Sequence, residues 1–353
     1  MLYKMHSRQV GELALLKGIR GQAARRVGGG IRLGIGDDCA LLLQRPGEEL
    51  AVTTDLSIAG RHFRLEWHPP ESVGHRTLAR GLSDLAAMGA RPLAAFLSIG
   101  LPRDLTMAGA HVAGQKGLTH RASSSKTSWF DRFLVGFLTL ADSWHVTLAG
   151  GDLAESPIPL ADIVLVGAVP RGRALLRSGA QPGDLLYVTG TLGGSSMGLE
   201  RLSKFIPPGA ARPRRMPQPM QELLAPQLYP RPRLAQGRYL QRRGLASSAI
   251  DLSDGLSTDL SHLCAESGVS AEVDCAVLPI HPGARLDQAL HGGEDYELLF
   301  TARPSSRVPR TIAGVPVTRI GRVLRAGRDH PQAILKTPRG SQALMPHGWE
   351  HFS

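Results

Sequence analysis

Short apolar runs alternate with helical patterns along nearly the whole chain, and this alternation limits the folds that the chain can adopt. The runs have the length and composition of buried strands. They cover residues 50–54, 93–99, 146–149, 163–169, 185–189, 249–252, 271–277, 296–301 and 317–323. Strands mixed with helices predict an α/β or α+β architecture.

Two amphipathic helices are predicted in the first half of the chain. Residues 129–144 place Phe133, Phe137 and other apolar side chains on one helical face. A second helix is predicted over residues 72–88, because prolines precede it and Gly89 follows it. The second helix has Leu78, Leu82 and Leu85 on one side, so both helices have an apolar face.

The length of 353 residues is enough for two domains of ~150 residues each. We expect an N-terminal domain at 1–169 and a C-terminal domain at 170–353. Residues 107–128 are small, polar and basic without periodicity, which predicts a loop-like insertion. Residues 206–233 are rich in proline and arginine and are predicted to form a surface connection.

Composition disfavours several classes of protein. No apolar run approaches the ~20 residues of a membrane span, and the N-terminus lacks the pattern of a secretory signal. The three cysteines are an odd number without CxxC spacing, which disfavours a disulfide framework and a zinc site. We therefore expect a cytoplasmic protein.

The net charge of +11 comes mainly from arginine, as in residues 212–215 and 231–243. Basic patches are typical of nucleic-acid binding. However, aromatic residues make up only 5% of the chain, and no helix-turn-helix, zinc-finger or RNP signature accompanies the arginines. A basic surface also attracts nucleotides and phosphates, so nucleic acid is the less favoured partner.

Five short segments place aspartate beside glycine or hydroxyl residues, at 36–38, 53–55, 82–84, 150–152 and 251–255. Three of them lie at or just after a predicted strand, where a rigid strand end holds a carboxylate beside an open loop. One such aspartate is more often a helix cap or a turn former. Five together favour a shared site.

Oxygen ligands of this kind suit hard divalent cations such as Mg²⁺. Converging carboxylates repel one another unless cations lie between them, and a polyphosphate carrying several Mg²⁺ ions resolves this conflict. A P-loop and a protein-kinase catalytic loop are both absent. The glycine-rich run 189–198 has the wrong spacing for a dinucleotide fingerprint and favours a tight turn. Gly292-Gly293-Glu294-Asp295 fits a turn and a substrate contact equally well.

Seven motifs together resemble the thiamine-monophosphate kinase family. They are GIGDDCALL, VTTDLSIAGRHF, LSDLAAMGARP, TLAGGD, GRALLRSGAQPGDLLYVTGTLG, AIDLSDGLSTDL and GGEDYELLFT, and they span nearly the whole chain apart from the insertion. The resemblance implies ATP-dependent phosphorylation of thiamine monophosphate to thiamine diphosphate. It also implies the two-domain aminoimidazole ribonucleotide synthetase-like fold, in which N-terminal sheets of two subunits form a barrel across a dimer and a C-terminal α/β domain follows.

The resemblance also assigns site residues by motif position. The implied ligands of several Mg²⁺ ions are Asp38, Thr53, Thr54, Asp55, Asp84, Asp152, Asp251 and Asp254. The implied ATP contacts are Gly151, Asp152, Arg177 and Ser253, and the implied contacts of thiamine monophosphate are His62, Glu294 and Trp349. Glu294 would offset the thiazolium charge and Trp349 would stack on a thiamine ring.

The chemistry of the acceptor agrees with this assignment. A phosphate monoester has a second pKa near ~6 and is largely deprotonated at neutral pH, so no strong general base is needed. Catalysis would consist of positioning and of charge neutralisation by metal ions.

Three features depart from the family pattern. Leu153-Ala154-Glu155 follows Asp152 where the family usually has Thr before Ser-Pro, Gly81 replaces a polar residue, and the insertion at 107–128 precedes a helix near the expected nucleotide site. Two alternatives stay open. One is another ATP-using enzyme of the superfamily, of the aminoimidazole ribonucleotide synthetase or selenophosphate synthetase type. The other is a non-catalytic nucleotide- or nucleic-acid-binding protein.

Overall fold

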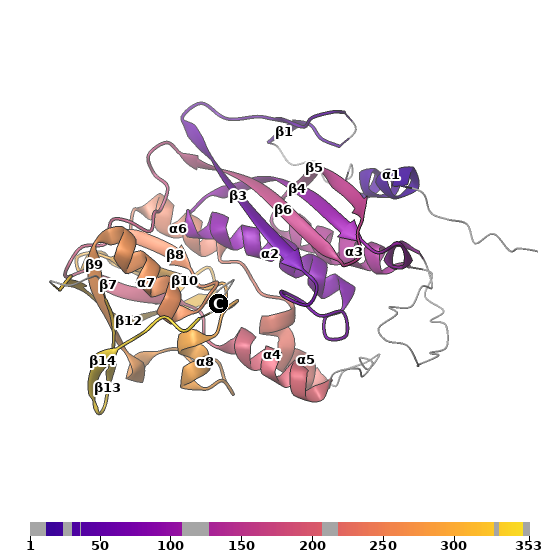
Figure 1. Ribbon diagram of the computed structural model, residues 1–353. Coiled ribbons are helices and arrows are strands. Elements are labelled where there is room, and N and C mark those ends of the chain that lie inside the picture. The colour runs from indigo at the N-terminus through magenta and orange to yellow at the C-terminus, as the bar shows by residue number, and fades with distance from the viewer. Residues whose placement is uncertain are drawn as a thin grey trace, which may run out of the picture.

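The structure is a computed structural model that describes residues 12–23, 30–35, 37–107, 127–206, 218–327 and 332–348. Most of the expected insertion at 107–128 and the candidate Trp349 lie outside these residues. No helix in the described part of the chain is both long and apolar enough to cross a membrane. The described part of the chain consists of two large sheets with their covering helices and a small two-stranded sheet near the N-terminus (Figure 1).

The helices are α1 Glu12–Ala23, α2 Pro70–Ala87, α3 Trp129–Ser143, α4 Gly194–Phe205, α5 Gln218–Leu228, α6 Leu234–Arg243, α7 Leu256–Ser267 and α8 Leu286–His291, with short 3₁₀ turns at Arg103–Thr106 and Cys275–Val277. The strands are β1 Ile31–Leu33, β2 Leu41–Leu42, β3 Glu48–Ile58, β4 Arg91–Leu101, β5 Thr147–Glu155, β6 Leu160–Pro170, β7 Leu185–Thr189, β8 Ser248–Asp251, β9 Val269–Asp274, β10 Leu298–Ala302, β11 Thr311–Ile312, β12 Val315–Arg325, β13 Ala333–Thr337 and β14 Gly340–Ala343.

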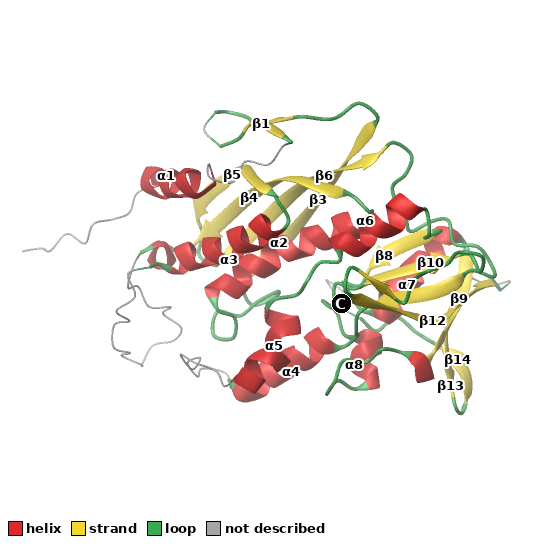
Figure 2. Ribbon diagram, turned by 180° about the vertical axis from the view of Figure 1, so that it is seen from behind, coloured by secondary structure: helices red, strands yellow, loops and turns green. Residues whose placement is uncertain are grey.

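The N-terminal part, up to Pro170, is built on a four-stranded sheet in the order β3-β6-β4-β5. β3, β6 and β4 are antiparallel neighbours, whereas β4 and β5 are parallel. Parallel neighbours need a crossover connection, and α3 supplies it. Helices α2 and α3 lie side by side across one face of this sheet (Figure 2).

The two helices approach each other closely because both carry glycine at their contact. A Cβ on Gly136 of α3 would lie 1.9 Å from the carbonyl oxygen of Glu71, and a Cβ on Gly74 of α2 would lie 2.0 Å from that of Phe133. The start of α3 is fixed by a capping box, in which Ser128 and Asp131 bond each other's backbone N–H groups.

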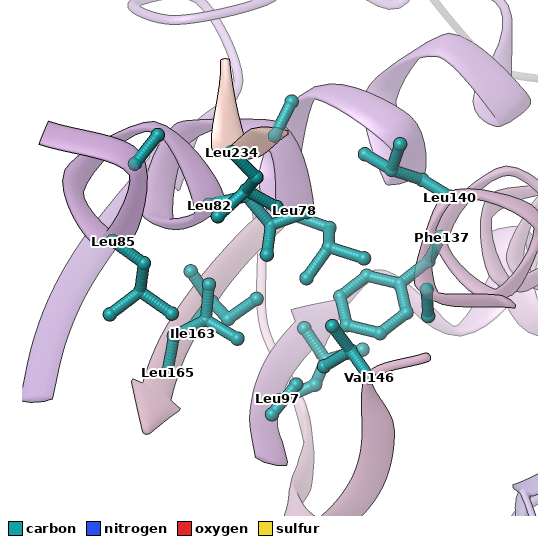
Figure 3. Close-up of a cluster of buried hydrophobic side chains, with 14 of the residues drawn as sticks. Leu78, Leu82, Leu85, Leu97, Phe137, Leu140, Val146, Ile163, Leu165 and Leu234 are labelled. Carbon is teal, nitrogen blue, oxygen red and sulfur yellow. The ribbon is translucent and has the colours of Figure 1, made fainter. Parts of the chain in front are cut away.

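The main hydrophobic core lies between α2, α3 and the N-terminal sheet (Figure 3). Leu78 and Leu82 of α2 pack with Leu165 of β6, and all three side chains are fully buried. The same core includes Leu234 of α6 and Phe300 of β10. Helix α2 is therefore enclosed between the N-terminal sheet and the C-terminal part, which brings its polar residues to the junction between them.

The C-terminal part, after Pro170, contains an eight-stranded sheet in the order β14-β13-β9-β12-β7-β10-β8, with β11 paired to β12. The pairings are antiparallel except that of β13 with β9. Its own core contains Ile250, Leu260 and Val323. Strand β8 ends at Asp251, next to α2.

Every strand and helix that the sequence predicted is present, with bounds that differ by a few residues. The prediction for 206–233 was wrong at Gln218–Leu228, because Leu224 and Leu228 are buried against α4 and form a helix there. The placement of Asp55 and Asp152 at strand ends was also wrong. Both lie within longer strands, whereas Asp251 is the last residue of β8.

Candidate active site

A cavity of about 810 Å³ lies between the N-terminal and C-terminal parts. Its walls come from β3 and the loop after it, from α2, α4 and α5, and from the loops around 251–254 and 291–296. The lining residues are Asp55, Gly60, Arg61, His62, Phe63, Arg64, Trp67, His68, Arg80, Asp84, Ser195, Ser196, Leu199, Gln227, Asp251, Ser253, Asp254, His291, Gly292, Gly293, Glu294, Tyr296, His347 and Gly348.

Helix α2 presents a stripe of charged residues to this junction. Arg76, Arg80 and Asp84 are four residues apart, and this spacing places them on one helical face. Arg80 and Asp84 line the cavity, while Arg76 is only 4% exposed and lies behind it. The apolar stripe Leu78, Leu82 and Leu85 packs into the core instead.

Two short hydrogen bonds tie three elements together beside the cavity. Thr53 Oγ1 on β3 donates to Asp84 Oδ2 at 2.5 Å. The neighbour of Asp84 on α2, Ser83, donates from Oγ to Asp251 Oδ2 at 2.6 Å. The two carboxylates are thereby oriented by hydroxyl groups from β3 and α2.

The aspartates crowd negative charge into this region. Burial, followed by the charge of Asp251, raises the pKa of Asp84 to about 7. Burial also raises the pKa of Asp251, and the pKa of Asp259 rises for the same reason and because of nearby Asp251 and Asp254. A bound cation would relieve this repulsion.

The donor set fits a hard divalent cation. The carboxylates and hydroxyls beside the cavity offer oxygen atoms, which Mg²⁺ prefers. Within the described ranges, however, no group of three or more His, Cys, Asp or Glu side chains is compact enough to hold a metal ion alone. An ion bound to Asp84 or Asp251 would therefore complete its shell with water and substrate phosphate.

The loop from Gly292 to Tyr296 has a strained backbone. Glu294 and Tyr296 adopt left-handed φ values of 66° and 51°, which cost roughly 1–3 kcal/mol each in non-glycine residues. The backbone N–H of Glu294 donates to the Ser253 carbonyl at 2.7 Å. Asp295 accepts hydrogen bonds from the N–H groups of Gly193 at 2.6 Å and Ser195 at 3.1 Å, so it caps the start of α4.

Glu294 is held by arginines. Its Oε1 lies 2.7 Å from Arg76 Nη2 and 4.0 Å from Arg80 Nη1. Burial alone would raise its pKa, but the charges of Arg76 and Arg80 outweigh burial and lower the pKa of Glu294 to about 2. The carboxylate is therefore charged and already paired.

The structure brings more than half of the sequence-predicted site residues together. The cavity is lined by His62, Asp55, Asp84, Asp251, Ser253, Asp254 and Glu294, and Thr53 lies directly behind Asp84. His62 is fixed through its Nδ1, which accepts a hydrogen bond from Ile58 N at 3.0 Å.

The other predicted residues lie away from the cavity lining. Thr54 is exposed on the opposite face of β3 from Thr53 and Asp55, because side chains alternate along a strand. Gly151 and exposed Asp152 belong to β5, at the far edge of the sheet from β3. Asp38 and Arg177 are exposed, although the charge of Arg177 partly opposes the rise that burial causes in the pKa values of Asp84 and Asp251. Trp349 is outside the described residues.

The family follows from matches over most of the sequence. A model described as AIR synthase related protein, N-terminal domain, matches residues 36–169. The corresponding C-terminal domain model matches residues 181–333. The thiamine-monophosphate kinase of Escherichia coli (strain K12) is 39% identical over 305 residues, covering 83% of this chain and 84% of that protein. The chain belongs to the thiamine-monophosphate kinase family.

Solved structures agree with this membership. The thiamine-monophosphate kinase of Stenotrophomonas maltophilia K279a is 36% identical, with a TM-score of 0.72 and coverage of 92% of this chain and 96% of that chain. AaThiL complexed with AMPPCP and TMP is 28% identical, with a TM-score of 0.71 and coverage of 99% and 100%. The two-domain α/β fold expected from the resemblance is therefore confirmed.

Several cavity residues of this family member were missed by sequence reasoning. Arg80 lines the cavity and Arg76 supports it, and their spacing of four and eight residues from Asp84 was a usable signal. Gln227 and His347 reach the cavity from α5 and the C-terminal segment. No local pattern marks them, since only tertiary packing brings them to the site.

Proposed function

We propose that the chain transfers the γ-phosphoryl group of ATP to thiamine monophosphate, giving thiamine diphosphate and ADP. The observation that carries this proposal is the convergence of four separate family motifs on one cavity. They contribute Asp55, Asp84, Asp251 and Glu294 from β3, α2, β8 and the strained loop. The relatives named thiamine-monophosphate kinase support the same reaction.

We also propose that Mg²⁺ ions bind at the cavity carboxylates, where they would neutralise charge on the transferred phosphoryl group. Asp55, Asp84, Asp251 and Asp254 are the best-supported ligands because they line the cavity. Thr53 supports this set through Asp84. The proposed roles of Asp38, Thr54 and Asp152 stay predictions, as do the ATP contacts from Gly151, Asp152 and Arg177.

The chain's own residues would act mainly by positioning. Ser253 lines the cavity at the start of the loop that follows β8, and it is our proposed ATP contact there. His62 and Glu294 face the same space and are the proposed contacts of thiamine monophosphate. Because Glu294 is already paired with Arg76, we expect it to shape the substrate pocket in addition to attracting the thiazolium charge. The stacking role of Trp349 stays a prediction.

A direct assay tests the reaction. Purified protein is incubated with ATP, Mg²⁺ and thiamine monophosphate, and ADP and thiamine diphosphate are quantified. Thiamine, which lacks the acceptor phosphate, should give no product. Asp254→Asn should remove activity, whereas Asp274→Asn, on β9 in an ion pair with Lys336 and away from the cavity lining, should not. Absence of thiamine diphosphate with the wild-type protein would refute the assignment.

We further propose a homodimer built on the N-terminal sheet. On β3, Leu50, Val52 and Leu56 are 43%, 61% and 43% exposed, and alternation places them on the face opposite α2. Exposed apolar groups of this kind are typical of interaction surfaces. Val52→Glu should give monomers in sedimentation velocity, and an unchanged sedimentation coefficient would contradict this interface. The division at 169/170 and the cytoplasmic location stay predictions.

A further inference from the structure

We propose that the guanidinium of Arg80 competes with a divalent metal ion for the carboxylate of Asp55. In this role Arg80 is a positioning residue that pairs with the carboxylate and prevents metal binding there until substrate binds. The inference deepens the proposed function, because it rests on the assignment of Asp55 as a metal ligand.

The contact uses both oxygens of the carboxylate. Arg80 Nε lies 2.9 Å from Asp55 Oδ2, and Arg80 Nη2 lies 2.7 Å from Asp55 Oδ1. This fork-to-carboxylate arrangement is the strongest and most directional ion pair that arginine makes. A metal ion at Asp55 therefore has to displace a two-point contact.

The pair is set into the cavity wall. Arg80 is 16% exposed and Asp55 is 22% exposed, and both line the cavity. Solvent screens such a pair less than it screens one on the open surface. The remaining nitrogen of Arg80, Nη1, lies 4.0 Å from Glu294 Oε1. The guanidinium therefore spans two acidic groups that belong to different parts of the fold.

The guanidinium of Arg80 occupies the position beside the Asp55 carboxylate where we expect the metal ion. Asp55 is two residues from Thr53, which bonds Asp84, and both carboxylates line the cavity. A divalent ion shared by Asp55 and Asp84 would lie beside the guanidinium and be repelled by it.

We expect substrate binding to relieve this repulsion between the guanidinium and the metal ion. A guanidinium released from Asp55 keeps its charge, because arginine stays protonated in proteins. Phosphate groups in the cavity would give it a new two-point partner. Metal binding at Asp55 is then coupled to the arrival of phosphate, and a metal ion alone binds weakly.

Metal binding by the full-length protein without nucleotide or thiamine compound tests this. Free Mn²⁺ is followed by electron paramagnetic resonance during titration. Arg80→Leu should tighten Mn²⁺ binding by about 10-fold or more, since one repulsive charge and one competing partner are removed. Arg80→Lys keeps the positive charge but loses the two-point contact with Asp55, so it should give a smaller gain in Mn²⁺ affinity. Adding Asp55→Asn to Arg80→Leu should abolish the gain.

A matched control is available on the same strand. Arg91 pairs with Glu48 of β3 at 3.1 Å, and the two side chains are 27% and 17% exposed, but neither lines the cavity. Arg91→Leu should leave Mn²⁺ affinity unchanged.

Two results would overturn the proposal. One is unchanged or weaker Mn²⁺ binding by Arg80→Leu with a normal melting temperature, which would make the pair a structural contact or a support for the ligand. If Arg80→Leu does not fold, Arg80→Lys decides, and an affinity no higher than that of wild type counts against the proposed competition. Because no thiamine phosphate is used, this outcome is independent of whether the proposed kinase reaction occurs.

Discussion

Ser83 Oγ donates a hydrogen bond to Asp251 Oδ2 at 2.6 Å, and this contact joins α2 of the N-terminal part to the end of β8 in the C-terminal part. Ser83 is fully buried and Asp251 is 3% exposed. The adjacent residue, Asp84, is bonded in turn by Thr53 of β3. Two carboxylates of the proposed metal site are thus held by hydroxyls, one within the N-terminal part and one across the junction of the two parts.

Asp251→Asn should lower kcat/KM for thiamine monophosphate by at least about 100-fold, because the neutral amide is a poor ligand for Mg²⁺. The fold should persist, since the amide oxygen still accepts from Ser83. Burial raises the pKa of Asp251, so removing its charge should not lower stability. Steady-state kinetics and thermal melting check both parts. A near-normal rate would exclude Asp251 from the metal site.

Arg76→Leu should destabilise the protein by roughly 2–4 kcal/mol, because it leaves the Glu294 carboxylate without its nearest cation. Arg76 also donates to the backbone carbonyls of Gln227 and His62, which would lose a partner. Urea unfolding measures the change. As a control, Arg103→Leu breaks a pair whose side chains are 61% and 63% exposed, and should cost less than about 1 kcal/mol. Equal losses for the two variants would contradict a special role for Arg76.

Asp295 should make stability fall as pH rises. Burial raises the pKa of Asp295 to about 7, against the lowering effect of the Gly193 and Ser195 N–H groups. An unfolded aspartate titrates near about 4, so between these pH values the unfolded chain is ionised and becomes more stable relative to the folded protein. This contribution is complete at low pH and is lost as pH rises through 7.

Asp295→Asn removes that titration. The stability of the variant relative to wild type should therefore improve by roughly 2–4 kcal/mol between about pH 4 and about pH 8. Urea unfolding of both proteins at the two pH values gives the difference. A difference that does not change with pH would show that the carboxyl titrates normally in the folded protein.

Gly136→Ala should destabilise the protein by roughly 2–4 kcal/mol, because the added Cβ would lie 1.9 Å from the Glu71 carbonyl oxygen and force α2 and α3 apart. Gly21→Ala in α1 is the matched control, since no heavy atom lies within 4 Å of its added Cβ. That change should stabilise by about 0.5–1 kcal/mol through helix propensity. Chemical unfolding compares the two variants, and a mild effect of Gly136→Ala would mean that the helices separate easily.

Local sequence patterns predicted much of the fold and part of the site. The apolar spacing of Phe133 and Phe137 predicted α3, because helical periodicity needs only neighbouring residues. Of the five aspartate segments expected to share a site, those at 53–55, 82–84 and 251–255 line one cavity, whereas those at 36–38 and 150–152 do not. The 150–152 segment was not placed beside them, since strand order puts β5 at the opposite edge of the sheet from β3.

The sequence by itself determined nine of the strands, the two long helices, the family and the carboxylate motifs, because these depend on residue type and short-range spacing. Tertiary structure alone decided which partner each carboxylate has. Asp55 and Arg80 are 25 residues apart, and Glu294 and Arg76 are 218 apart. The packing of α2 between the two large sheets brings these groups within hydrogen-bond distance. Because burial makes an unpaired charge costly in free energy, each of these charges needs a partner there.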